Sequence, residues 1–151
     1  MMRVPVAVTF LLALLLCLGC SRPVRVEGFI RAQDAPGGVY HFDVDLQDSL
    51  AVYDIKVFSR VESVFKHLPG MMNVPLSIVW TAPSGQQYSE DVWMTLLRPS
   101  ESPFLLETEQ YYRRALVPSE YGKWTVDVRV TDSPKGFSGL GLISIRRDGT
   151  R

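Results

Sequence analysis

Few side chains in this sequence have the type and spacing that acid–base or nucleophilic chemistry needs. Histidine occurs twice, as His41 and His67, and neither has a second candidate ligand at a spacing typical of metal sites. Ser138 lies in the glycine-rich segment GFSGLG, but the nucleophile elbow Gly-x-Ser-x-Gly requires glycine where Leu140 stands. The sequence therefore predicts no catalytic residue and no metal site, and we expect a protein that is not an enzyme.

A cluster of acidic residues beside one histidine offers an alternative chemistry. Alternation places His41, Asp43 and Asp45 on one face of a predicted strand, and Asp48 lies just beyond it. Clustered carboxylates could form a weak Ca²⁺ site, because hard cations prefer oxygen ligands. The segment lacks the glycine and asparagine residues of a calcium loop, so we favour a solvated strand face.

A cysteine near the N-terminus is the clearest candidate for a covalent modification. One basic residue, an apolar run of about 15 residues and a small residue precede Cys20, which is the pattern of a secretory signal. Gly19 directly before Cys20 resembles the lipobox of bacterial lipoproteins, in which the cysteine receives a diacylglycerol and becomes the mature N-terminus. Cys17 is excluded as the lipid site because the bulky Leu16 precedes it. We predict a lipid on Cys20; an ordinary signal peptide or an uncleaved anchor is the alternative.

The chain divides into three predicted parts. Residues 1–19 are the expected lipoprotein signal peptide, 20–38 the lipidated N-terminus with a polar tether, and 39–151 a single folded domain. Sixteen Lys and Arg residues balance sixteen Asp and Glu residues, so no overall field attracts nucleic acid. Once residues 1–19 are removed together with Cys17 and Cys20 carries a lipid, no thiol remains for a disulfide or a thiolate metal site. The domain must therefore be stabilised by its apolar core.

Alternation of apolar and polar residues dominates the domain, with a period of two. The clearest runs are residues 40–46, 53–57, 76–80, 124–130 and 140–146. Proline and glycine punctuate them, and Pro83-Ser84-Gly85 predicts a hairpin with a positive φ at Gly85. The best helical candidate, residues 107–115, fits a strand equally well. We predict an all-β antiparallel sandwich of about seven to eight strands, immunoglobulin-like or jelly-roll-like, with a barrel as the alternative.

The three tryptophans are predicted to differ in their surroundings. Trp80 and Trp124 are in phase with aliphatic neighbours and are expected in the core. Trp93 shares its predicted face with Asp91 and Thr95, which places the indole on the wetter face. An exposed indole can stack on a sugar or anchor a protein interface, so these three residues form the candidate contact site for a partner or glycan. A bulge that turns Trp93 into the core is the alternative.

Several segments resemble the gliding-motility lipoprotein GldH family of Bacteroidetes. They are the lipobox at Cys20 and the runs YDIKV (53–57), PLSIVWTAPSG (75–85), YGKW (121–124) and GLGL (139–142). The resemblance implies a small lipoprotein anchored in the outer membrane and facing the periplasm. It also implies a structural or interaction role with other envelope proteins, without catalytic residues, nucleic acid or a small-molecule cofactor. A carbohydrate-binding lipoprotein of a glycan-uptake system is the alternative function, motivated by the sandwich pattern and Trp93.

Overall fold

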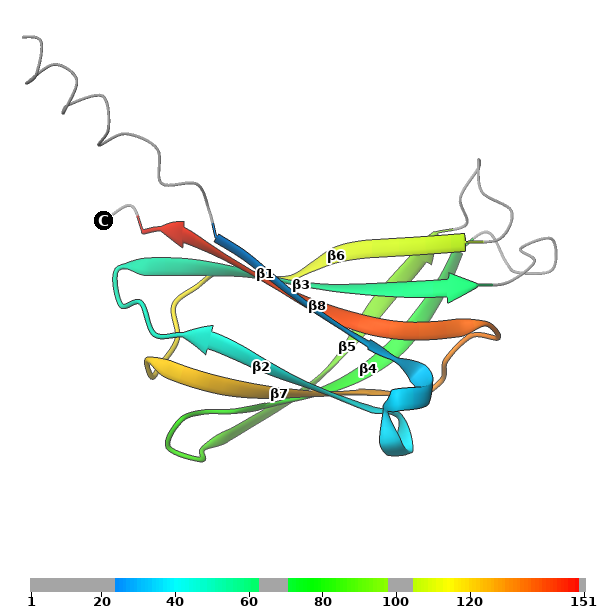
Figure 1. The fold of residues 1–151 in the computed structure, drawn as a ribbon, viewed down its shortest axis with the longest axis horizontal. Coiled ribbons are helices and arrows are strands. Elements are labelled where there is room, and N and C mark those ends of the chain that lie inside the picture. The colour runs from blue at the N-terminus through cyan, green and yellow to red at the C-terminus, as the bar shows by residue number, and fades with distance from the viewer. Residues whose placement is uncertain (1–23, 63–70, 98–104, 150–151) are drawn as a thin grey trace, which may run out of the picture.

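A computed structural model describes residues 24–62, 71–97 and 105–149, and these form an all-β sandwich (Figure 1). Cys20 and His67 lie outside the described residues. The elements follow in the order β1 (Val24–Arg31), the 3-10 turns η1 (Ala32–Asp34) and η2 (Pro36–Gly38), β2 (Val39–Leu46), β3 (Ala51–Glu62), β4 (Met71–Thr81), β5 (Gln87–Leu97), β6 (Leu105–Leu116), β7 (Gly122–Val130) and β8 (Phe137–Asp148).

The strands form two antiparallel sheets with the orders β1-β8-β3-β6 and β2-β7-β4-β5. Within the described residues, the first strand pairs with the last, the second with the seventh, the third with the sixth and the fourth with the fifth. The chain thus follows a long hairpin that has been folded over into two layers, which is the topology of a jelly roll. The predicted antiparallel sandwich is confirmed.

Alternating side chains of the two sheets fill the space between them. In β7, Trp124, Val126 and Val128 are buried while their neighbours are partly or fully exposed, as the period of two predicted. The segment 107–115 lies within strand β6 rather than a helix. Trp80 and Trp124 are both buried, with 7% and 5% of their surfaces exposed, so their predicted core positions are confirmed.

Glycine is required by the fold at two positions. Gly85 has a φ of 88° in the β4–β5 turn, a conformation that favours glycine. A Cβ atom on Gly139 would lie 2.4 Å from the backbone oxygen of Ile30 on the neighbouring β1. Gly139 therefore stands where another backbone approaches closely.

The structure differs from the expectation of a tether over residues 20–38. Val24–Arg31 is strand β1, paired with β8 along its whole length, and the described sandwich therefore begins at Val24 rather than at residue 39. No residue of this edge strand is buried, so its burial pattern is weak. Its stabilisation comes from backbone pairing with β8, more than 100 residues later in the chain, which no local pattern reveals.

Asp54 also differs from the simple alternation, which would place it in water beside Lys56. Its side chain is buried and accepts hydrogen bonds from the backbone N–H of Ala115 and from Arg147, both at 2.8 Å. Ala115 has a positive φ of 50°, and the β3–β6 register shifts beside this point. The carboxylate therefore satisfies a backbone donor that an irregular β6 leaves unpaired.

The environment of Asp54 predicts a pH dependence of stability. Burial acts to raise the pKa of its carboxyl group, but the Ala115 N–H and Arg147 outweigh burial and hold the pKa below its usual range. A lowered pKa stabilises the fold fully above the unfolded-state pKa of about 4, and the contribution is lost as the pH falls through the folded-state value. We expect Asp54→Asn to lower the unfolding free energy at pH 7 by about 1–3 kcal/mol. The stability of the Asp54→Asn variant, measured by urea titration, should also decline less steeply than that of the wild type between pH 5 and pH 2. An equal decline in the two proteins would contradict this role of Asp54.

Candidate functional site

Trp93 stands on the outer face of the β2-β7-β4-β5 sheet. Its side chain is 64% exposed, whereas Met94 and Leu96 point into the core and are buried. Asp91 is exposed and Thr95 half-buried on the same face as Trp93. The predicted wetter face of β5 is therefore confirmed, and no bulge turns the indole inward along the regular β4–β5 register.

Polar side chains surround the indole on the neighbouring strand. Pro75 lies directly opposite Trp93 in the β4–β5 ladder, with the pairs Ser77–Asp91 and Asn73–Thr95 on either side. The Thr95 hydroxyl donates a hydrogen bond of 3.0 Å to the Asn73 side-chain oxygen. The surface around Trp93 thus offers one large apolar ring within a field of hydrogen-bonding groups. We call the outward side chains of these three ladder pairs the Trp93 face.

Gln110 of β6 fixes the free edge of β5 beside this face. Its side-chain amide donates to the backbone oxygen of Trp93 at 3.1 Å and accepts from the backbone N–H of Thr95 at 3.0 Å. One side chain therefore replaces the next strand of the ladder and joins the edges of the two sheets. The backbone that carries Trp93 is consequently held in place. Sequence reasoning missed Gln110, because its partners lie on a strand that pairs with β4 and not with β6.

An apolar extension of the Trp93 face was also missed from the sequence. Met71 and Leu97 lie opposite each other at the far end of the β4–β5 ladder and are 60% and 59% exposed. Leu97 is four residues beyond Trp93, so the two side chains share one face of β5. Three large apolar side chains therefore extend along one outer surface, which is the kind of patch that marks an interaction site.

A pocket of about 270 Å³ opens on the side of the sandwich between β5 and β6. Its walls include Tyr88 and Glu90 of β5 and Tyr112 and Arg113 of β6, with Trp80 and Trp124 among the lining residues. The Trp80 indole N–H donates to the Tyr112 hydroxyl, which in turn donates to Glu90. Arg113 pairs with both carboxylate oxygens of Glu90. The alternation within β5 and within β6 could not predict that side chains of the two strands line one pocket.

The polar groups of this pocket are already paired with one another. Burial and the hydrogen bond to Glu90 raise the pKa of the Tyr112 hydroxyl far above its ordinary value, so this group is a neutral donor at physiological pH. The Glu90 carboxylate forms an ion pair with Arg113. The arrangement is suited to holding the two sheet edges together and to contacting an apolar or ring-shaped group.

Two residues weighed for metal and nucleophilic chemistry, His41 and Ser138, have structural partners. His41 pairs through Nδ1 with the Asp127 carboxylate on the neighbouring strand β7. The Ser138 hydroxyl donates to the backbone oxygen of Arg60 at 3.0 Å. Over residues 24–62, 71–97 and 105–149, no three His, Cys, Asp or Glu side chains are grouped so that they could hold a metal ion.

Comparisons with known proteins give no relative from which a role could be transferred. No protein-family model matches the chain, and no curated protein matches it. In the described part of the chain, none of the helical segments is long and apolar enough to cross a bilayer. The predicted lipid site, Cys20, precedes the first described residue, Val24.

Proposed function

We propose that this protein is a non-enzymatic, lipid-anchored component of the cell envelope that binds another envelope protein through the Trp93 face. Its resemblance to the gliding-motility lipoprotein family supports an outer-membrane location facing the periplasm. The Gly19-Cys20 lipobox supports attachment to the membrane through a lipid on Cys20. Together these features describe a folded module that is held at a membrane and presents one sheet face to a partner.

The exposure of Trp93 is the observation that carries this proposal. Aromatic side chains bury about 150–250 Å² when fully covered, so an indole that is 64% exposed leaves on the order of 150 Å² in water. At about 25 cal/mol per Å², covering that area is worth up to about 4 kcal/mol. This is the contribution of an interface hot spot, and tryptophan is among the residues enriched at such positions.

A carbohydrate-binding function is the second candidate, and the composition of the Trp93 face favours it. Asp91, Asn73 and Ser77 surround the indole with hydrogen-bonding groups, and the indole offers a flat surface for the C–H face of a sugar ring. The exposed Met71–Leu97 pair next to it is apolar and has no hydrogen bonds to offer to sugar hydroxyls. This apolar extension is why we place the protein partner first.

Trp93→Ala is expected to separate binding from folding. The indole is mostly exposed, and Gln110 contacts Trp93 through its backbone oxygen, which the substitution keeps. The unfolding free energy should therefore change by no more than about 0.5 kcal/mol. Loss of a hot spot of about 2 kcal/mol or more should raise the dissociation constant of the partner complex at least thirtyfold or so. Thermal unfolding measures the change in stability. Co-purification of the complex from solubilised membranes measures the loss of the partner.

Tyr111→Ala is the matched control, since this tyrosine is 41% exposed on the other sheet, on β6. We expect it to leave the complex intact. A Trp93→Ala protein that retains its partner at wild-type yield contradicts the proposal. Retention of protein partners together with loss of binding to oligosaccharides on a glycan array would favour the carbohydrate function instead.

A further inference from the structure

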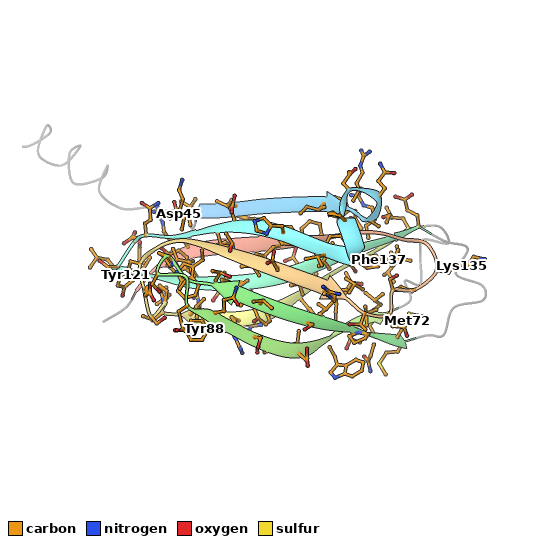
Figure 2. All side chains as sticks on the ribbon, turned by 90° about the horizontal axis from the view of Figure 1, so that it is seen from below. Asp45, Met72, Tyr88, Tyr121, Lys135 and Phe137 are labelled. Atoms are coloured by element: carbon orange, nitrogen blue, oxygen red, sulfur yellow. The ribbon has the colours of Figure 1, made fainter. Side chains whose placement is uncertain are left out.

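One end of the sandwich gathers two loops together with the start of β1, which follows the predicted lipid site by four residues in the sequence. The register pairs Leu46 with Gly122 and Tyr53 with Leu116, which places the β2–β3 loop (47–50) beside the β6–β7 loop (117–121). Figure 1 shows β1 beginning and β8 finishing at this same end. In Figure 2, Asp45 and Tyr121 lie at this end and Met72 and Lys135 at the opposite one. We call the two loops together the anchor end.

Large apolar side chains project from both loops of the anchor end. Leu50 is 68% exposed, Val117 is 61% exposed and Tyr121 is 47% exposed. The first residue of β1, Val24, is 45% exposed at the same level of the sheet. Leucine and valine favour the hydrocarbon side of a bilayer surface, and tyrosine is enriched at the interface.

Hydrogen bonds tie both loops to neighbouring parts of the sandwich. The Leu50 N–H donates to the Asp48 carboxylate at 2.9 Å, and its backbone oxygen accepts from the Gly149 N–H at 3.0 Å. In the β6–β7 loop, the Glu120 carboxylate accepts bonds from the Ser84 N–H and hydroxyl of the adjacent hairpin. The exposed apolar tips are therefore part of a fixed surface.

The acidic groups of this end also have partners. Asp48 pairs with Arg146 at 3.6 Å, and Glu120 is bound by Ser84. Paired carboxylates are repelled less by an anionic membrane surface than free ones. The ion pair with Arg146 therefore reduces the repulsion that Asp48 would meet at an anionic membrane surface.

The short segment between Cys20 and β1 is the reason to expect a bilayer next to the anchor end. Cys20 precedes Val24 by four positions, and four extended residues at about 3.5 Å each span at most about 14 Å. A lipid on Cys20 therefore keeps the start of β1 within that distance of the bilayer surface, and β1 begins at the same end of the sandwich as the two loops. Trp93 lies six positions along β5 from Gln87, about 20 Å farther from this end.

We propose that the anchor end rests on the bilayer, with Leu50, Val117 and Tyr121 in the interfacial layer. This inference relies on the proposed lipid on Cys20. It adds a second membrane contact that fixes the orientation of the sandwich. In that orientation the Trp93 face and its Met71–Leu97 extension stand away from the lipid, where a partner protein can reach them.

The test uses the full lipidated chain, reconstituted into vesicles of phosphatidylethanolamine and phosphatidylglycerol. Leu50→Cys, Val117→Cys and, as control at the opposite end, Lys135→Cys are labelled with an environment-sensitive fluorophore. Because a lipid on Cys20 leaves the mature chain without a free thiol, wild type treated with the same reagent reports any unmodified cysteine. Quenching by nitroxide-labelled lipids should be several-fold stronger at positions 50 and 117 than at 135, with blue-shifted emission at both.

Equal quenching at all three positions, in a protein that floats with the vesicles, overturns the membrane contact while leaving the anchor in place. A wild type that does not float, and whose Cys20 takes the thiol reagent, overturns the anchor and this inference together. Stronger quenching at position 135 than at 50 and 117 also overturns it, since the sandwich would then be oriented the other way.

Discussion

Trp124→Ala is expected to lower the unfolding free energy by about 3–5 kcal/mol. The indole is 95% buried, packs edge-on against Trp80 at 6.0 Å between ring centroids, and lies 6.1 Å from Tyr88. Its N–H donates to the Glu120 backbone oxygen at 3.0 Å, which ties the β6–β7 loop to the core. The substitution removes both the packing and this loop contact. For a domain of this size the melting temperature should fall by about 10 °C or more.

Trp93→Ala is the matched comparison, because it removes the same side chain from an exposed position. Calorimetry or circular dichroism of the two variants under identical conditions makes the comparison. A melting temperature for Trp124→Ala within a few degrees of that for Trp93→Ala would show that the two indoles are not in the environments described above.

Cys20→Ser is expected to abolish lipid attachment completely. A serine hydroxyl cannot form the thioether to diacylglycerol, and several acyl chains at about 0.8 kcal/mol per buried methylene otherwise make the attachment effectively permanent. Cells fed a palmitate analogue should label the wild type and leave the variant unlabelled.

Cys17→Ser provides a control within the same segment, since Leu16 before it is too bulky for the lipid site. We expect this variant to incorporate label as the wild type does. Equal labelling of Cys20→Ser and wild type would disprove the lipoprotein interpretation. Loss of label in Cys17→Ser alone would show that the lipid is on Cys17 and not on Cys20.

The strands that sequence reasoning predicted best are those with one face in the core. Val126 and Val128 of β7 alternate with polar residues because one side of the sheet is buried and the other is wet. The same alternation correctly placed Trp93 outward and Trp80 inward. A slip of one residue would exchange the two faces of a strand, so the burial of one face fixes which side chains point outward. Gly85 was predictable because a tight turn needs a positive φ.

The features that escaped prediction depend on pairs of residues far apart in the chain. Val24 and Val26 of β1 are exposed, so the strand has no strong pattern of its own and exists because β8 supplies its hydrogen bonds. Gln110 of the other sheet binds the backbone at the edge of β5. Asp54 can be buried because the Ala115 N–H and Arg147 donate hydrogen bonds to it. Polar residues of this kind look like surface positions until their partners are placed.

The central claim is that the Trp93 face contacts a partner protein in the cell. The most direct measurement is site-specific photocrosslinking in living cells with a photoreactive phenylalanine derivative in place of Asp91, next to the exposed indole. Asp43, exposed on β2 at the other edge of the same sheet, is the control position. We predict a light-dependent protein adduct at position 91 that is absent at position 43 and disappears when Trp93→Ala is added. Absence of an adduct at 91, or the same adduct with and without the Trp93 side chain, would contradict the claim.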